Sequence, residues 1–174
     1  MFKTSSLLLI VIVTLVALGA HAKHYPQLKW DVQPDAKLCP KHPISFTLFL
    51  RQQNRAALEQ KVREVSDPRS PLYGRYLSVD DVTAIVQPTK ETLNAVDQWL
   101  AAHSPLSVTY HRNMDSIKVV MARENVEKMM KVHIQKYTHQ ITGNSILRSA
   151  TDPVIDSSVA AHIDLITGIS QFPI

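Results

Sequence analysis

The stretch Ser66-Asp-Pro-Arg-Ser-Pro-Leu-Tyr-Gly-Arg-Tyr-Leu-Ser78 separates two segments with helical patterns and decides how they are joined. Pro68 and Pro71 fix φ and disfavour helical geometry in the residues before them, so one helix must end here. Gly74 can adopt a left-handed backbone that its tyrosine neighbours could adopt only with strain. We therefore predict a rigid structural connector between two helices.

Turn-forming and large apolar side chains both occur in this connector. Its structure is expected to depend on Asp67, Pro68, Pro71, Tyr73, Gly74 and Tyr76. Asp67 precedes a proline and can hold a turn through its side-chain oxygens. Tyr73 and Tyr76, with their leucine neighbours, are too apolar for a solvated linker, so we expect the connector to pack against a core. A surface loop with scattered tyrosines is the alternative that composition leaves open.

Short motifs in and around the connector resemble a known family. They are Arg51-Gln-Gln-Asn54, Val65-Ser-Asp-Pro68, Ser70-Pro71, Tyr73-Gly74 and Tyr76-Leu77. Together they resemble the activation domain, or prosegment, of the sedolisin (kumamolisin-like) serine-carboxyl peptidases, and most of all a prosegment of the tripeptidyl-peptidase I type. The resemblance runs from about Ile44 to the end of the chain, and a series of this kind is more specific than any one short motif.

The first residues have the pattern of a secretory signal peptide. Lys3 precedes an apolar run over 7–18 that only Thr14 interrupts, and Ala20-His-Ala22 supplies a small-x-small cleavage signal. The apolar run is too short to span a bilayer, which takes about 20 residues. We predict a signal peptide over 1–22 and a mature protein in the secretory pathway, extracellular or lysosomal, with no membrane segment after the signal is removed.

Composition excludes several classes of function. The chain of 174 residues carries a formal net charge of +4 with its basic residues interleaved with acids, so no nucleic-acid partner is expected. A single cysteine, Cys39, rules out an internal disulfide framework and a cysteine-based zinc site. We expect no cofactor. The mature length suits one domain, which we divide into an extended N-terminal arm over 23–43, an activation domain over 44–167 and a C-terminal tail over 168–174.

Before the connector, the pattern predicts one strand and one helix. Apolar residues at alternate positions over 44–51 predict a strand that is buried on at least one face. Asn54 is expected to cap a helix that ends near Val65.

After the connector, further elements follow in short order. Ser78 and Thr89 are expected to cap helices over 79–86 and 90–102. A strand hairpin (108–110 and 117–121), a helix (123–132), a second pair of strands (134–139 and 146–149) and a last strand (162–166) complete the chain.

These elements predict an α+β fold. If the helices over 78–102 are an insert, the order up to residue 139 is strand, helix, hairpin, helix, strand. This is the pattern of a ferredoxin-like (split βαβ) antiparallel sheet with helices on one face, and the resemblance to sedolisin prosegments implies the same fold.

No constellation of residues in the sequence supports catalysis. The resemblance is to a prosegment only, and the family's serine nucleophile and its acidic partners would lie beyond residue 174. Asp80 and Asp81 are adjacent, which is a poor geometry for two carboxylates that share a proton, and they suit the first turn of a helix better. We therefore expect no peptidase activity from this chain.

The histidines are expected to act singly. Those of the mature chain are His24, His42, His103, His111, His133, His139 and His162. His133 and His139 are assigned to one strand about 20 Å apart, too far to share a metal ion. Histidine side chains titrate near pH 6.5, so they could loosen a complex in an acidic compartment, although surface histidines without consequence are commoner.

The C-terminal tail is where we expect a partner to be met. Its residues Gly168, Ile169, Gln171, Phe172 and Pro173 resemble the end of a prosegment, which leads toward the peptidase. A last strand followed by a frayed tail is the plainer interpretation, and both can hold together.

Taken together, the resemblance implies a free-standing activation domain that inhibits a tripeptidyl-peptidase I-like serine peptidase in trans, or templates its folding. The alternative is the N-terminal part of a truncated tripeptidyl-peptidase zymogen, in which the peptidase is met in cis. An unrelated extracellular binding module is a third, weaker hypothesis.

Overall fold

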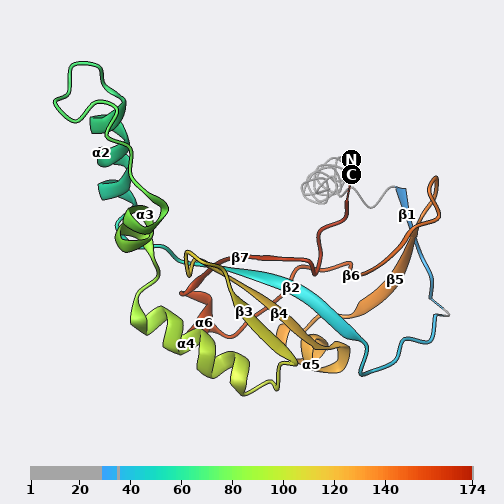
Figure 1. The fold of residues 1–174 in the computed structure, drawn as a ribbon. Coiled ribbons are helices and arrows are strands. Elements are labelled where there is room, and N and C mark those ends of the chain that lie inside the picture. The colour runs from blue at the N-terminus through green and yellow to red at the C-terminus, as the bar shows by residue number, and fades with distance from the viewer. Residues whose placement is uncertain (1–28, 35, 174) are drawn as a thin grey trace, which may run out of the picture.

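The computed structural model describes residues 29–34 and 36–173, and Figure 1 shows their arrangement. Mixed helices and antiparallel strands confirm the α+β class. In chain order the elements are β1 (Trp30–Val32), β2 (Pro43–Leu50), α2 (Arg55–Ser66), α3 (Val79–Val86), α4 (Lys90–Ala101), β3 (Ser107–Tyr110), β4 (Ser116–Ala122), α5 (Arg123–Met130), β5 (Ile134–His139), β6 (Ser145–Ser149), α6 (Ser157–Ala160) and β7 (Ile163–Thr167).

A four-stranded sheet with the order β3-β4-β2-β7 forms the centre of the fold, and all of its pairings are antiparallel. The predicted first strand is confirmed as β2. Its side chains alternate between a buried and an open face, so that Phe46 and Leu48 are fully covered while Phe49 remains exposed. This period of two gives the sheet one apolar face and one mixed face.

Helices α4, α5 and α6 lie on the apolar face of the sheet (Figure 1). Val96 and Leu100 from α4, Val126 and Met130 from α5 and Val159 from α6 join the buried residues of the strands in one continuous core. These helices shield apolar strand side chains from water, which is the main contribution to the stability of such a layer.

A second sheet, with the order β1-β5-β6, was not expected. The strand over 134–139 was predicted to complete the central sheet, and that prediction is wrong, because β5 pairs with β1 and β6. The last strand of the central sheet is β7, close to the predicted strand over 162–166. The local pattern identified the strands from β2 onward, but not β1. It could not identify which strands pair, because pairing depends on long-range contacts. The ferredoxin-like topology therefore remains a prediction.

Two helices have the opposite roles from those predicted: α4 covers the sheet and α2 does not. The helix after β2 was predicted to cover the sheet, but α2 buries only Val65, and it pairs with α3 in an arm that projects from the sheet (Figure 1). The helix assigned to an insert, α4, covers the sheet instead, because it carries the larger apolar face with Val96, Trp99 and Leu100 buried.

Helix caps were mostly predicted correctly. Ser78 and Asp81 form a reciprocal capping box at the start of α3, and the Thr89 hydroxyl accepts a hydrogen bond from the Thr92 N–H at the start of α4. These hydrogen bonds to Ser78 hold the pKa of the Asp81 carboxyl below its usual value. Asn54 stands at the N-cap position of α2, but its side chain makes no cap hydrogen bond and donates instead to the Ile85 carbonyl across the base of the arm.

One glycine is required where β7 ends. Gly168 has φ +91°, and a Cβ atom there would lie 3.0 Å from the Ser45 carbonyl oxygen and 3.2 Å from Phe46 Cα. Both neighbours belong to the backbone of β2, the central strand, so they cannot move aside cheaply. The chain can pass β2 at this point only without a side chain.

We predict that Gly168→Ala lowers the free energy of unfolding by about 2–4 kcal/mol, because it combines a left-handed backbone with an overlap against β2. Gly74→Ala is the matched control: φ there is +74° but no atom lies within 4 Å of the added Cβ, so a loss of about 1 kcal/mol is expected. Urea denaturation of both variants measures the difference. Equal losses would mean that the close approach at Gly168 does not constrain the fold.

Candidate functional site

The connector lies at the far end of the arm, away from the core (Figure 1). Tyr73 is 54% exposed and Tyr76 is 73% exposed, and Pro68 and Pro71 are also exposed. The expectation that these tyrosines pack into a core is therefore wrong, and the alternative of a surface loop describes the structure.

The connector is held by its own hydrogen bonds. The Gly74 N–H donates to the Val65 carbonyl at 2.9 Å, and the Asp67 side chain accepts from the backbone and the guanidinium of Arg69. These bonds to Arg69 lower the pKa of the Asp67 carboxyl. Gly74 has the positive φ that the sequence predicted. These hydrogen bonds within the turn order the loop without burial of its apolar side chains in a core.

The predicted C-terminal tail packs into the domain. Ile169 is 1% exposed in the main core, and Phe172 is buried against Tyr137 with ring centroids 4.8 Å apart. The Trp30 indole Nε1 donates to the Pro173 carbonyl at 3.1 Å. The interpretation of a frayed tail is therefore wrong for Gly168 to Pro173, because Ile169 and Phe172 are buried in the two cores and Pro173 is held by its carbonyl.

The arm expected over 23–43 is also partly integrated. Residues Trp30–Val32 form β1, and Trp30 packs with Tyr137 and Phe172 in a small second core. The predicted signal peptide and His24 lie outside the described residues.

We predict that Phe172→Ala lowers the free energy of unfolding by about 3 kcal/mol, because it empties the centre of the second core. Tyr76→Ala, at the exposed connector, should change it by no more than about 0.5 kcal/mol. Thermal or urea denaturation of the Phe172→Ala and Tyr76→Ala variants tests whether Phe172 is buried and Tyr76 exposed. A larger effect at Tyr76 than at Phe172 would restore the connector as the packed element.

The open face of the central sheet is a surface that our sequence analysis did not identify. Among the described residues no helix lies over this face, whereas α4, α5 and α6 lie on the other (Figure 1). It carries side chains from all four strands: Ser45, Thr47, Phe49, Ser107, Thr109, Ser116, Lys118, Val120, Leu165 and Thr167. The alternation in β2 contained the signal, since Ser45, Thr47 and Phe49 fall on the face opposite the core.

The open face has an apolar pair of side chains near the β7 edge of the sheet. Phe49 and Leu165 are cross-strand partners on β2 and β7, and they are 40% and 52% exposed. The remaining positions are small, polar or aliphatic, and Lys118 is the one charged residue in the set. A mixed surface with an exposed aromatic residue is typical of sites that bind another protein.

The described histidines are spread over the domain and none lies on a strand of the central sheet. His162 shares a hydrogen bond with Thr92, and His103 with the Trp99 carbonyl. His133 precedes β5 and lies 3.3 Å from a Glu127 carboxylate oxygen, so the placement of His133 and His139 on one strand was wrong. Within residues 29–34 and 36–173, no group of three or more metal-ligating side chains comes together.

The structure is a small α+β domain whose central sheet has one face packed by helices and one open face. Residues 31–172 match the pro-kumamolisin activation domain, and the chain belongs to this family. The resemblance found in the connector motifs is thereby confirmed.

Curated relatives are tripeptidyl-peptidases. The chain is 30% identical to tripeptidyl-peptidase 1 of Rattus norvegicus over 153 residues, which cover 85% of this chain and 27% of the relative. It is 30% identical to tripeptidyl-peptidase 1 of Homo sapiens over 135 residues, or 77% of this chain and 24% of the relative. The chain thus spans about a quarter of the length of the relatives it matches. None of the helices in the described ranges is long and apolar enough to cross a membrane.

Proposed function

We propose that this activation domain binds a sedolisin-type serine peptidase through the open face of its central sheet and holds the enzyme inactive. The observation that carries the proposal is the uncovered face of a sheet whose other face carries the main core. The family supplies the class of partner, because its activation domains accompany peptidases.

The composition of the open face supports a protein partner. Phe49 and Leu165 offer an adjacent apolar pair, while serine and threonine side chains around them provide hydrogen-bonding groups. A stable complex of this kind buries on the order of 1,600 Å². Aromatic side chains near the centre of such an interface commonly contribute most of the binding free energy.

The domain has no catalytic role in this proposal. It acts in trans as an inhibitor or folding template of a tripeptidyl-peptidase-like enzyme in the secretory pathway, extracellular or lysosomal. Because the chain matches only about a quarter of each relative, action in cis within a longer zymogen is the alternative. Transcript sequence downstream of residue 174 distinguishes the two.

Histidine protonation is not supported as a release mechanism at this face. His42, His111 and His162 stand next to the ends of β2, β3 and β7, and no described histidine lies within a strand of the central sheet. Release of the peptidase in an acidic compartment would then depend chiefly on titratable groups of the peptidase.

We predict that the purified protein inhibits tripeptidyl-peptidase 1 near neutral pH and that Phe49→Asp weakens this inhibition at least about tenfold, because it buries a charge in the apolar pair of the open face. Hydrolysis of an Ala-Ala-Phe-type substrate measures the inhibition constant. Ile141→Asp is the matched control, since Ile141 is 80% exposed in the turn after β5, away from the open face.

Absence of inhibition by the unmodified protein would remove the inhibitor role. Equal losses for the two aspartate variants would retain the partner but exclude the open face as the binding surface.

A further inference from the structure

Strand β7 forms one edge of the central sheet, and its outer side offers unpaired backbone groups. Thr167 and Leu165 lie opposite Thr47 and Phe49 of β2. The Arg51 N–H donates to the His162 carbonyl, whereas the Leu50 N–H points the other way, to Asp115. In an antiparallel pair this alternation turns the N–H and C=O of Ile166 away from β2.

Gln171 shows that this edge can pair with an amide. Its side-chain Nε2 donates to the Ile166 carbonyl at 3.0 Å, and its Oε1 accepts from the Gly168 N–H at 2.9 Å. A single carboxamide thus makes one donor and one acceptor hydrogen bond to this edge, as the N–H and C=O of one residue in a neighbouring strand would. Among the residues that the structure describes, Gln171 supplies the amide at this edge, and the Ile166 N–H faces outward beside it.

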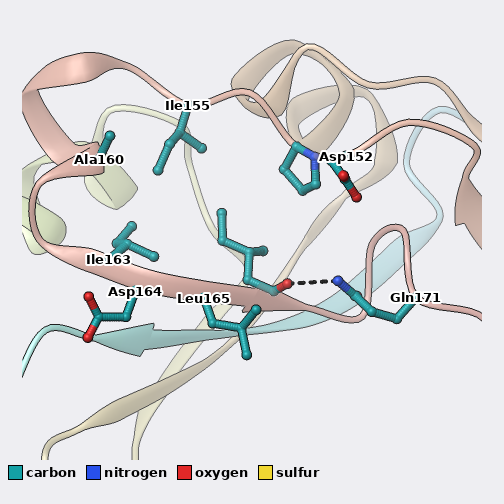
Figure 2. Close-up of a pocket in the computed structure, with 9 residues that line it drawn as sticks. Asp152, Ile155, Ala160, Ile163, Asp164, Leu165 and Gln171 are labelled. Atoms are coloured by element: carbon teal, nitrogen blue, oxygen red, sulfur yellow. Dashed lines mark hydrogen bonds between the residues drawn. The ribbon is translucent and has the colours of Figure 1, made fainter. Parts of the chain in front are cut away.

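A cavity of about 360 Å³ lies along the same edge. Figure 2 shows Ile155 and Ala160 across the cavity from β7, which contributes Ile163 and Leu165. Pro153 and Ile166 complete its apolar lining, and Asp152, Asp164 and Gln171 are its polar residues. The volume falls within the range of ligand sites, which starts at about 300 Å³.

The charged residues that line the cavity determine which kind of ligand it favours. Two of its residues are aspartates and none is lysine, arginine or histidine. Asp164 pairs with Arg51 at 3.1 Å, and Asp152 accepts a hydrogen bond from the Ser170 hydroxyl at 2.8 Å. The walls therefore favour a neutral or cationic occupant over an anionic one, with apolar groups on the isoleucine and proline surface.

We propose that the cavity beside β7 binds an extended peptide segment that carries apolar and basic side chains in alternation. The segment adds to β7 as a further strand, its backbone pairs with Ile166, and an apolar side chain enters the cavity. The carboxamide of Gln171 occupies one end of the edge and competes with the incoming strand there. The proposal concerns the edge of the sheet, so it stands or falls separately from the binding of a peptidase at the open face.

The test uses two synthetic seven-residue peptides, one that alternates lysine with valine and one that alternates glutamate with valine. Titrations followed by NMR measure affinity, and amide hydrogen exchange reports on the Ile166 N–H. We expect the lysine peptide to bind at least about threefold more tightly than the glutamate peptide and to slow exchange at Ile166. No binding, or binding without protection of Ile166, overturns the proposal, and equal affinities overturn the assignment of a basic ligand.

Two substitutions locate the site. Ala160→Phe fills the cavity and should weaken binding at least about tenfold, whereas Ser158→Phe on the same helix, outside the lining, should leave it unchanged. Gln171→Ala removes the competing amide, whose two hydrogen bonds the peptide must otherwise displace, and should tighten binding at least about twofold. Equal effects of the two phenylalanine variants, or weaker binding by Gln171→Ala, would place the peptide elsewhere.

Discussion

The alternation of side chains along β2 is the constraint on which the rest of the domain depends. β2 is paired on both sides, with β4 and β7, so its register fixes the position of every other strand in the central sheet. A shift of one residue would expose Phe46 and Leu48 and bury Ser45 and Thr47, which would be very unfavourable. The same alternation that builds the core therefore also determines which side chains stand on the open face.

The close passage of Gly168 against β2 extends this constraint to the end of the domain. After β7 the chain must cross over the backbone of Ser45 and Phe46 to place Ile169 in the main core and Phe172 in the second one. The C-terminal segment thereby connects the two sheets. Its Ile169 carbonyl accepts a hydrogen bond from the Ser149 N–H at the edge of β6, and its Gln171 carbonyl accepts one from Arg148.

Local features could be predicted from the sequence, and features that depend on distant contacts could not. The alternation in β2, the caps at Ser78 and Thr89 and the positive φ of Gly74 all follow from neighbouring residues. The pairing of β5 with β1 could not be predicted, because it depends on Trp30 meeting Tyr137 and Phe172 across most of the chain. The open face was implicit in the alternation of β2, but the pattern does not tell whether a second layer covers it. The connector was misjudged because apolar content was taken as evidence of burial, although its own hydrogen bonds hold it.

The hydrogen bond from Trp30 to Pro173 joins two residues that lie 143 positions apart. The two ends of the described domain are therefore held at one corner, and a mechanical load applied between them would act first on this contact. It would then peel β1 from β5, one hydrogen bond at a time, before any shear reached the central sheet. A domain fastened in this way yields to tension at its smaller sheet, while the strands that form its open face keep their register.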